Sequence, residues 1–148
     1  DFKTLEKIIK KYDIDIAQLP YNVLDQRESS KRLFFKLKRK KIEIHARSIF
    51  LQGLLLEKNI KLKKKKFKEL NTILIQWNNW LNKKKIKNIN ACMNFVFQNK
   101  NIDKIVIGFD SLDNLKEIIN VINMQEKFKF DDLNLRFNYK AIDPRNWN

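Results

Sequence analysis

The chain reads DIAQLPYNVLDQR from Asp15 to Arg27, and this stretch decides which fold the sequence predicts. It overlaps a short and largely apolar run, Ile14–Leu19, of the kind that forms a parallel strand covered on both faces. Pro20 ends the run, because proline has no backbone N–H to give to a strand ladder. We therefore expect a buried strand with Gln18 exposed at its end, followed by a polar loop.

Helical and strand patterns alternate on both sides of this stretch. Two further strands are expected at Ile42–Ser48 and Lys104–Ile107, and a helix at about Ser30–Lys40 with Ser29 or Ser30 as its N-cap. Apolar residues recur at helical spacing in these sets: Phe2, Leu5, Ile8, Ile9 and Tyr12; Leu33, Phe34 and Leu37; Phe67, Leu70, Ile73, Leu74, Trp77 and Leu81; Ile89, Cys92, Phe95 and Val96; Leu112, Leu115, Ile118, Ile119 and Ile122. Strands that alternate with helices predict βαβ units and a parallel sheet.

Charge and cysteine usage narrow the classes of function. The formal net charge of +15 raises nucleic acid and anionic membrane as partners. Lysines are spread along the whole chain, however, so we interpret them as solvated, and we interpret Lys61–Lys66 as a loop, with a polyanion site as the alternative. The sequence contains no run of 18 apolar residues and therefore predicts no membrane-spanning helix. Cys92 is the one cysteine, which excludes an internal disulfide and suits the reducing cytoplasm.

Three blocks of the sequence together resemble the aldo-keto reductase family. Asp15–Arg27 resembles the sixth strand and following loop of the family's barrel. Ile42–Ser48, running into Ile49–Leu55, resembles the next strand and loop, and Ile105–Glu117 resembles the last strand and the start of the helix that grips the cofactor. The blocks occur in the family's order and at its spacing, and Ile142–Trp147 resembles the chain end of one bacterial branch.

The resemblance implies an α/β fold that is only part of a (β/α)8 TIM barrel. A complete barrel takes about 250 residues, whereas this chain has 148. We expect residues 1–148 to be the C-terminal portion of the barrel domain, with about the last three β/α units and a C-terminal tail. Two sheet edges would then be exposed and could lead to self-association. The side chains expected to face inward, and so to lose packing, are Ile14, Ile16, Ile44, Ala46, Ile105 and Ile107.

The residues that carry out catalysis in this family are not matched in this sequence. The resemblance implies a tyrosine proton donor tuned by a lysine, an aspartate and usually a histidine, all from the first four barrel units. Tyr12, Tyr21 and Tyr139 lie in no segment that resembles that block, so none is assigned the donor role. His45 alternates with Ile44 and Ala46 in a strand pattern, and we expect a structural role for it. No catalytic residue is therefore predicted.

What the resemblance does imply is half of a cofactor site. Gln18 matches the amide that binds the nicotinamide carboxamide, and Arg47 stands where many relatives place an aromatic ring that stacks on nicotinamide. The other matched positions, in the pyrophosphate loop and at the adenosine end, are Ser48, Phe50, Gln52, Gly108, Ser111, Asn114 and Glu117. Relatives that strongly prefer NADP often have lysine at the position of Gly108 and arginine at that of Asn114, so we expect NADP(H) or NAD(H) with a modest preference for NADP.

Three functions follow as hypotheses. The first is the C-terminal part of an NAD(P)H-dependent oxidoreductase that reduces a small aldehyde or ketone, possibly sugar-derived, with the nicotinamide dinucleotide as its cofactor. The second is a stand-alone α/β binding or interaction module without redox chemistry. The third is a basic nucleic-acid-binding domain, whose affinity would collapse as salt rises. The first hypothesis expects no specific nucleic acid, no membrane and no metal as partner.

Overall fold

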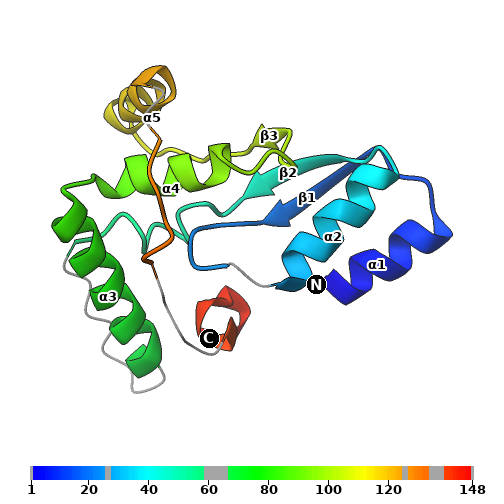
Figure 1. Cartoon of the computed structure of the whole chain (residues 1–148), viewed down its shortest axis with the longest axis horizontal. Helices are drawn as coiled ribbons and strands as arrows, with labels where there is room; N and C mark the ends of the chain where they lie inside the picture. Colours follow the sequence, from blue (N-terminus) through cyan, green and yellow to red (C-terminus); the bar gives the residue numbers. More distant parts are fainter. Residues whose placement is uncertain (1, 26–27, 59–66, 125–126, 134–138, 148) are drawn as a thin grey trace.

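The computed structural model describes residues 2–25, 28–58, 67–124, 127–133 and 139–147 (Figure 1). Within these residues, parallel strands form one sheet in the order β1 (Ile16–Pro20), β2 (Glu43–Arg47), β3 (Lys104–Ile105). The predicted parallel sheet is confirmed, but its strand bounds differ. β1 begins two residues later than predicted and includes Pro20, and β3 ends two residues earlier. Proline is tolerated in β1 because β1 is an edge strand.

Helices connect the strands as the sequence predicted. The helix α2 (Glu28–Arg39) joins β1 to β2, and α3 (Lys68–Lys84) and α4 (Asn88–Phe97) lie between β2 and β3. The predicted N-cap of α2 is wrong, because this helix begins at Glu28 and therefore contains Ser29 and Ser30. The helix α1 (Phe2–Lys11) precedes the sheet, and α5 (Leu112–Met124) and the short 3-10 helices η2 (Tyr139–Ile142) and η3 (Pro144–Asn146) follow it. The basic stretch Lys61–Lys66 lies outside the described residues.

Among the described residues, helices cover only one face of the sheet. In Figure 1, α1 and α2 lie side by side along β1 and β2, and their apolar residues pack with Ala17, Leu19 and Ile44. Residues of α4 and α5 pack around Ala46 on the same face. On the other face Ile16 is 51% exposed and Gln18 is exposed. The prediction of a strand buried on both faces is therefore wrong for β1.

Because helices cover one face of the sheet, most of the side chains that we expected to lose packing keep it. Ile44 and Ala46 are buried beneath the helices, since they alternate with the open-face residues along β2. Ile14, Ile105 and Ile107 are half-buried against the same cores, and of the six expected residues Ile16 alone is largely exposed.

The helical stripes were predicted with unequal success. The stripe of α3 is confirmed, with Trp80 as an additional buried residue, and so is that of α4. In α5 the buried residues are Ile118 and Val121, whereas Leu112, Ile119 and Ile122 are exposed. In α1, Ile9 is buried but Ile8 is exposed, and so is Tyr12, the residue that follows the helix. The helices α1 and α5 thus carry apolar side chains that the described residues leave exposed.

None of the helices in the described ranges is long and apolar enough to cross a membrane.

Candidate functional site

The open face of the sheet carries a row of polar side chains. In the strand register Gln18 of β1 lies beside His45 of β2, which lies beside Lys104 of β3. The sequence predicted Gln18 at the end of its strand. Gln18 is instead the third residue of β1, because the strand continues through Pro20. Its amide is exposed and can donate and accept hydrogen bonds.

Arg47 and Ser48 stand at the carboxyl end of β2, at the edge where parallel α/β sheets bind their ligands. Nη1 of Arg47 donates a hydrogen bond to Oγ of Ser48 over 3.1 Å. The backbone of Ser48 is held as well, since Nδ2 of Asn22 donates to its carbonyl oxygen over 3.4 Å. The backbone N–H of Tyr21 donates to the carbonyl of Arg47 over 3.0 Å. The ends of β1 and β2 are therefore tied together, and the exposed guanidinium of Arg47 is held beside the Ser48 hydroxyl.

The loop after β2 has an unusual backbone. Ser48, Leu51 and Gln52 have positive φ angles of 56°, 48° and 56°, and Gly53 has a φ of 82°. Side chains make such angles costly, so the rest of the structure must hold the loop in place. Nε1 of Trp77 donates to the carbonyl oxygen of Leu55 over 3.0 Å, within the buried core. Sequence reasoning treated Trp77 only as part of a helical stripe and missed this anchor.

Phe50 and Gln52, the two other loop residues expected in the cofactor site, differ in how far they are buried. Phe50 is half-buried and packs against two of the apolar clusters, so its ring contributes to packing. Gln52 is exposed. Gly53 lies in a turn, as expected for glycine at positive φ.

The residues expected at the adenosine end lie around the start of α5. Oγ of Ser111 accepts a hydrogen bond from the backbone N–H of Asn114 over 3.2 Å, which is the geometry of a helix N-cap. The side-chain amide of Asn114 donates to the carboxylate of Asp110. Gly108 and Glu117 are exposed. These bonds join residues at the start of α5 only to one another. Figure 1 shows α5 well away from β1. In the described residues, the structure therefore leaves the nine expected residues in two separate groups.

A charged cluster, also missed by sequence reasoning, lies on the open face. Nζ of Lys104 is 2.8 Å from Oε1 of Glu43, and Nε2 of His45 is 3.2 Å from the same oxygen. The hydrogen bond from Lys104, followed by the contact with His45, holds the pKa of Glu43 below its usual range. Nε2 of His45 is shielded from solvent, and its contact with Glu43 is too poorly aligned for a good hydrogen bond. The i, i+2 spacing of Glu43 and His45 was the available signal, because it places both on one face of a strand.

The histidine and tyrosines give no catalytic arrangement in the described part of the chain. His45 lies beside Glu43 within the sheet, and its structural role stays a prediction. The ring of Tyr21 lies 5.3 Å from that of Phe34 and 5.3 Å from that of Phe95, and burial raises the pKa of its hydroxyl. Tyr12 follows the last residue of α1, and Tyr139 lies in η2. No group of potential metal ligands was found among these described residues.

Comparison with known proteins identifies the family. The family model described as the aldo/keto reductase family matches residues 1–134. No curated protein matches the chain. The matched range includes all three strands and the five α-helices described above. The chain therefore belongs to the aldo/keto reductase family, a family of oxidoreductases.

Proposed function

We propose that this chain is the C-terminal part of an NAD(P)H-dependent reductase of small aldehydes or ketones, possibly sugar-derived, and that it carries part of the cofactor site. The observation that carries the proposal is the position of Gln18 and Arg47. Both side chains are exposed on the uncovered side of the sheet, one within β1 and the other at the carboxyl end of β2. In a (β/α)8 barrel this side of the sheet faces the packed interior, and the active site lies at the carboxyl ends of the strands.

The chemistry of these donors fits a nicotinamide dinucleotide. The amide of Gln18 can pair with a carboxamide through one donor and one acceptor. The guanidinium of Arg47 can stack on a planar ring or bind a phosphate. Because it already holds the Ser48 hydroxyl, Arg47 approaches an anion from a fixed position. The cofactor would supply a hydride to the carbonyl carbon, while these residues would only bind and orient it.

At the adenosine end the structure supports weaker recognition. Ser111 and Asn114 already bond to the start of α5 and to Asp110. Gly108 has no side chain with which to bind an extra phosphate. We therefore propose NADP(H) or NAD(H) with only a modest preference for NADP.

The proton donor would come from barrel units other than the three described. Two observations support this. The open face of the sheet is uncovered by the described residues, and Ile16 is exposed on it. Apolar side chains are also exposed on the outermost helices, as at Ile8 of α1 and Ile119 of α5. Further β/α units would bury all of these groups, and the carbonyl oxygen would receive its proton from a residue of those units.

Nuclear magnetic resonance of the nitrogen-labelled 148-residue chain tests the proposal. Addition of NADPH is expected to shift the side-chain amide resonances of Gln18 and the backbone resonance of Ser48. Shifts confined to residues away from β1, β2 and α5 would show that the open face does not bind the cofactor.

A further inference from the structure

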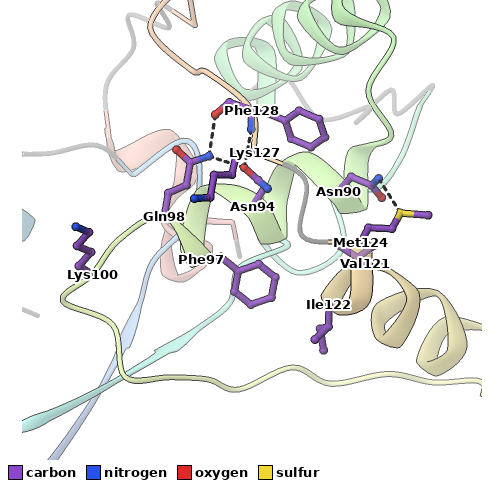
Figure 2. A pocket seen from close by; sticks show the side chains of 10 residues that line it. All are labelled: Asn90, Asn94, Phe97, Gln98, Lys100, Val121, Ile122, Met124, Lys127 and Phe128. Carbon is purple, nitrogen blue, oxygen red and sulfur yellow. Dashed lines mark hydrogen bonds between the residues drawn. The ribbon is translucent and has the colours of Figure 1, made fainter.

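A cavity of about 580 Å³ lies between α4, α5 and the segment that begins at Lys127 (Figure 2). None of the residues expected to hold the cofactor lines it. Its size falls within the usual range for small-molecule sites, about 300–1,000 Å³. The cavity is therefore independent of the proposed cofactor site.

One wall of the cavity is held in place by two side-chain amides, that of Asn94 in α4 and that of Gln98 at the C-cap of this helix. Oδ1 of Asn94 accepts a hydrogen bond from the backbone N–H of Phe128 over 2.9 Å, and Nε2 of Gln98 donates to the carbonyl oxygen of Phe128 over 2.7 Å. Asn94 is buried, so its amide has exchanged water for these partners. Next along the segment, Phe130 stacks on Trp80 with ring centroids 5.5 Å apart. This wall, which includes Lys127, is therefore formed before any ligand binds.

The lining is apolar and partly open to solvent. Phe97, Ile122 and Met124 line the cavity and are 48%, 50% and 58% exposed. Val121 of α5 also lines the cavity and is buried. Large apolar side chains gathered around one concavity indicate a surface that gains free energy when something apolar covers it.

The cavity has a cationic end and an apolar end. Figure 2 shows Lys100, Lys127 and Gln98 toward one end, and Met124 and Val121 toward the other. Two ammonium groups beside one apolar cavity complement a ligand with an anionic head and a hydrocarbon chain. A neutral apolar ligand would leave these cations unused, and a small inorganic anion would leave the apolar wall exposed.

We propose that this cavity binds a single-chain amphiphile with a carboxylate head, in the manner of a free fatty acid. The carboxylate lies at Lys100 and Lys127, and the alkyl chain lies along Phe97, Ile122 and Met124. The amide groups that hold Phe128 fix the distance between the two ends.

Equilibrium dialysis of isotope-labelled decanoate against the whole chain, below the micellar concentration, tests the proposal. Decanoate is expected to bind more tightly than decanol, which lacks the charge, and than butyrate, which lacks the chain. Raising the salt concentration should weaken the binding of decanoate and leave the binding of decanol unchanged, because salt screens the attraction between exposed charges. Lipid vesicles serve as a separate probe, and binding to vesicles without binding to free decanoate would overturn the assignment to a free amphiphile.

Matched variants locate the binding. The double change Lys100→Glu and Lys127→Glu is expected to weaken the binding of decanoate about tenfold or more, because it reverses two charges at the rim of the cavity. The control is Lys3→Glu with Lys7→Glu on α1, which changes the net charge equally and should have no effect. Ile122→Asn should weaken binding about fivefold through lost apolar contact. Its control is Ile119→Asn on the same helix, where Ile119 is 46% exposed and does not line the cavity.

Three further results would overturn the proposal. The first is equal binding of decanoate and butyrate. The second is an equal loss in the cavity variants and their controls, which would indicate adsorption to the chain in general. The third is unchanged binding in both cavity variants.

Discussion

The indole N–H of Trp77 donates a hydrogen bond to the backbone carbonyl of Leu55, over 3.0 Å and within the protein core. This bond joins α3 to the strained loop that begins at Ser48. The same carbonyl accepts a second bond from the side-chain amide of Asn88 over 3.1 Å. The loop that carries part of the proposed cofactor site is thus positioned from outside the sheet.

Trp77→Phe is expected to lower the free energy of unfolding by about 2 kcal/mol, through the lost hydrogen bond and a cavity in the core. Trp80→Phe is the matched control, because Trp80 donates over 3.0 Å to the carboxylate of Asp132, which is exposed and can bond to water instead. Its cost should be smaller. Urea unfolding measures both, and an equal or greater loss in Trp80→Phe would contradict the role assigned to Trp77.

Gln18→Ala is expected to weaken NADPH binding by roughly 1 kcal/mol, about fivefold in Kd, which is the usual net contribution of one hydrogen bond. Binding to the wild-type chain should itself be weak, because the chain is proposed to carry only part of the site. Gln76→Ala on the exposed side of α3 is the control and should bind as the wild type does. Calorimetric titration measures the affinities, and unchanged binding in Gln18→Ala would remove this residue from the site.

Carbonyl reduction by this chain alone is expected to be negligible, because the hydride step needs a proton donor and we propose that this donor lies outside the three described units. The measurement is NADPH consumption with a broad set of aldehydes. Turnover on the order of 1 per second, as in an ordinary enzyme, would show that the catalytic acid lies in this chain.

Self-association is expected for the chain on its own. The edge strands β1 and β3 offer unpaired backbone groups, and Ile16 is exposed on the uncovered face. We expect either oligomers or a loosely packed, dye-binding state, and sedimentation with thermal unfolding distinguishes them. A compact monomer with a single sharp transition would contradict this prediction and would favour an autonomous binding module.

Acid is expected to weaken the link between Asp103 and β2. The carboxylate of Asp103 accepts from the backbone N–H of Ile44 over 2.7 Å and from Lys38 over 2.6 Å, and these bonds, that of Ile44 first, hold its pKa below the usual range. A lowered pKa stabilises the fold above the unfolded-state value of about 3.9, and this contribution disappears as the pH falls through the folded-state value.

The variant Asp103→Ala should therefore be less stable than the wild type at pH 7 by about 1 kcal/mol, and the difference should shrink toward pH 2. Asp103→Asn keeps an acceptor for Ile44 and should lose less. Denaturation midpoints across this pH range give the test. A difference that is independent of pH would mean that the charge of Asp103 does not matter.

The sequence by itself determined the order of elements and the family. Alternating apolar runs and helical stripes predicted the parallel sheet, and three motif blocks pointed to the aldo-keto reductases. Local patterns suffice for this, because strand and helix periods are properties of neighbouring residues. The stripe of α3, from Leu70 to Leu81, was read correctly for that reason.

Tertiary structure decided what each pattern faces. Ile44 and Ala46 alternate with His45 whether the apolar side points into a barrel or under helices, and the packing of α2 and α4 settled the choice. Likewise, Ile119 and Val121 of α5 differ little in apolar character, yet the contact with α4 buries only Val121. The Trp77 anchor, the Glu43–Lys104 pair and the cavity beside Lys127 join residues far apart in the chain. Such contacts leave no local periodicity, so only the folded chain reveals them.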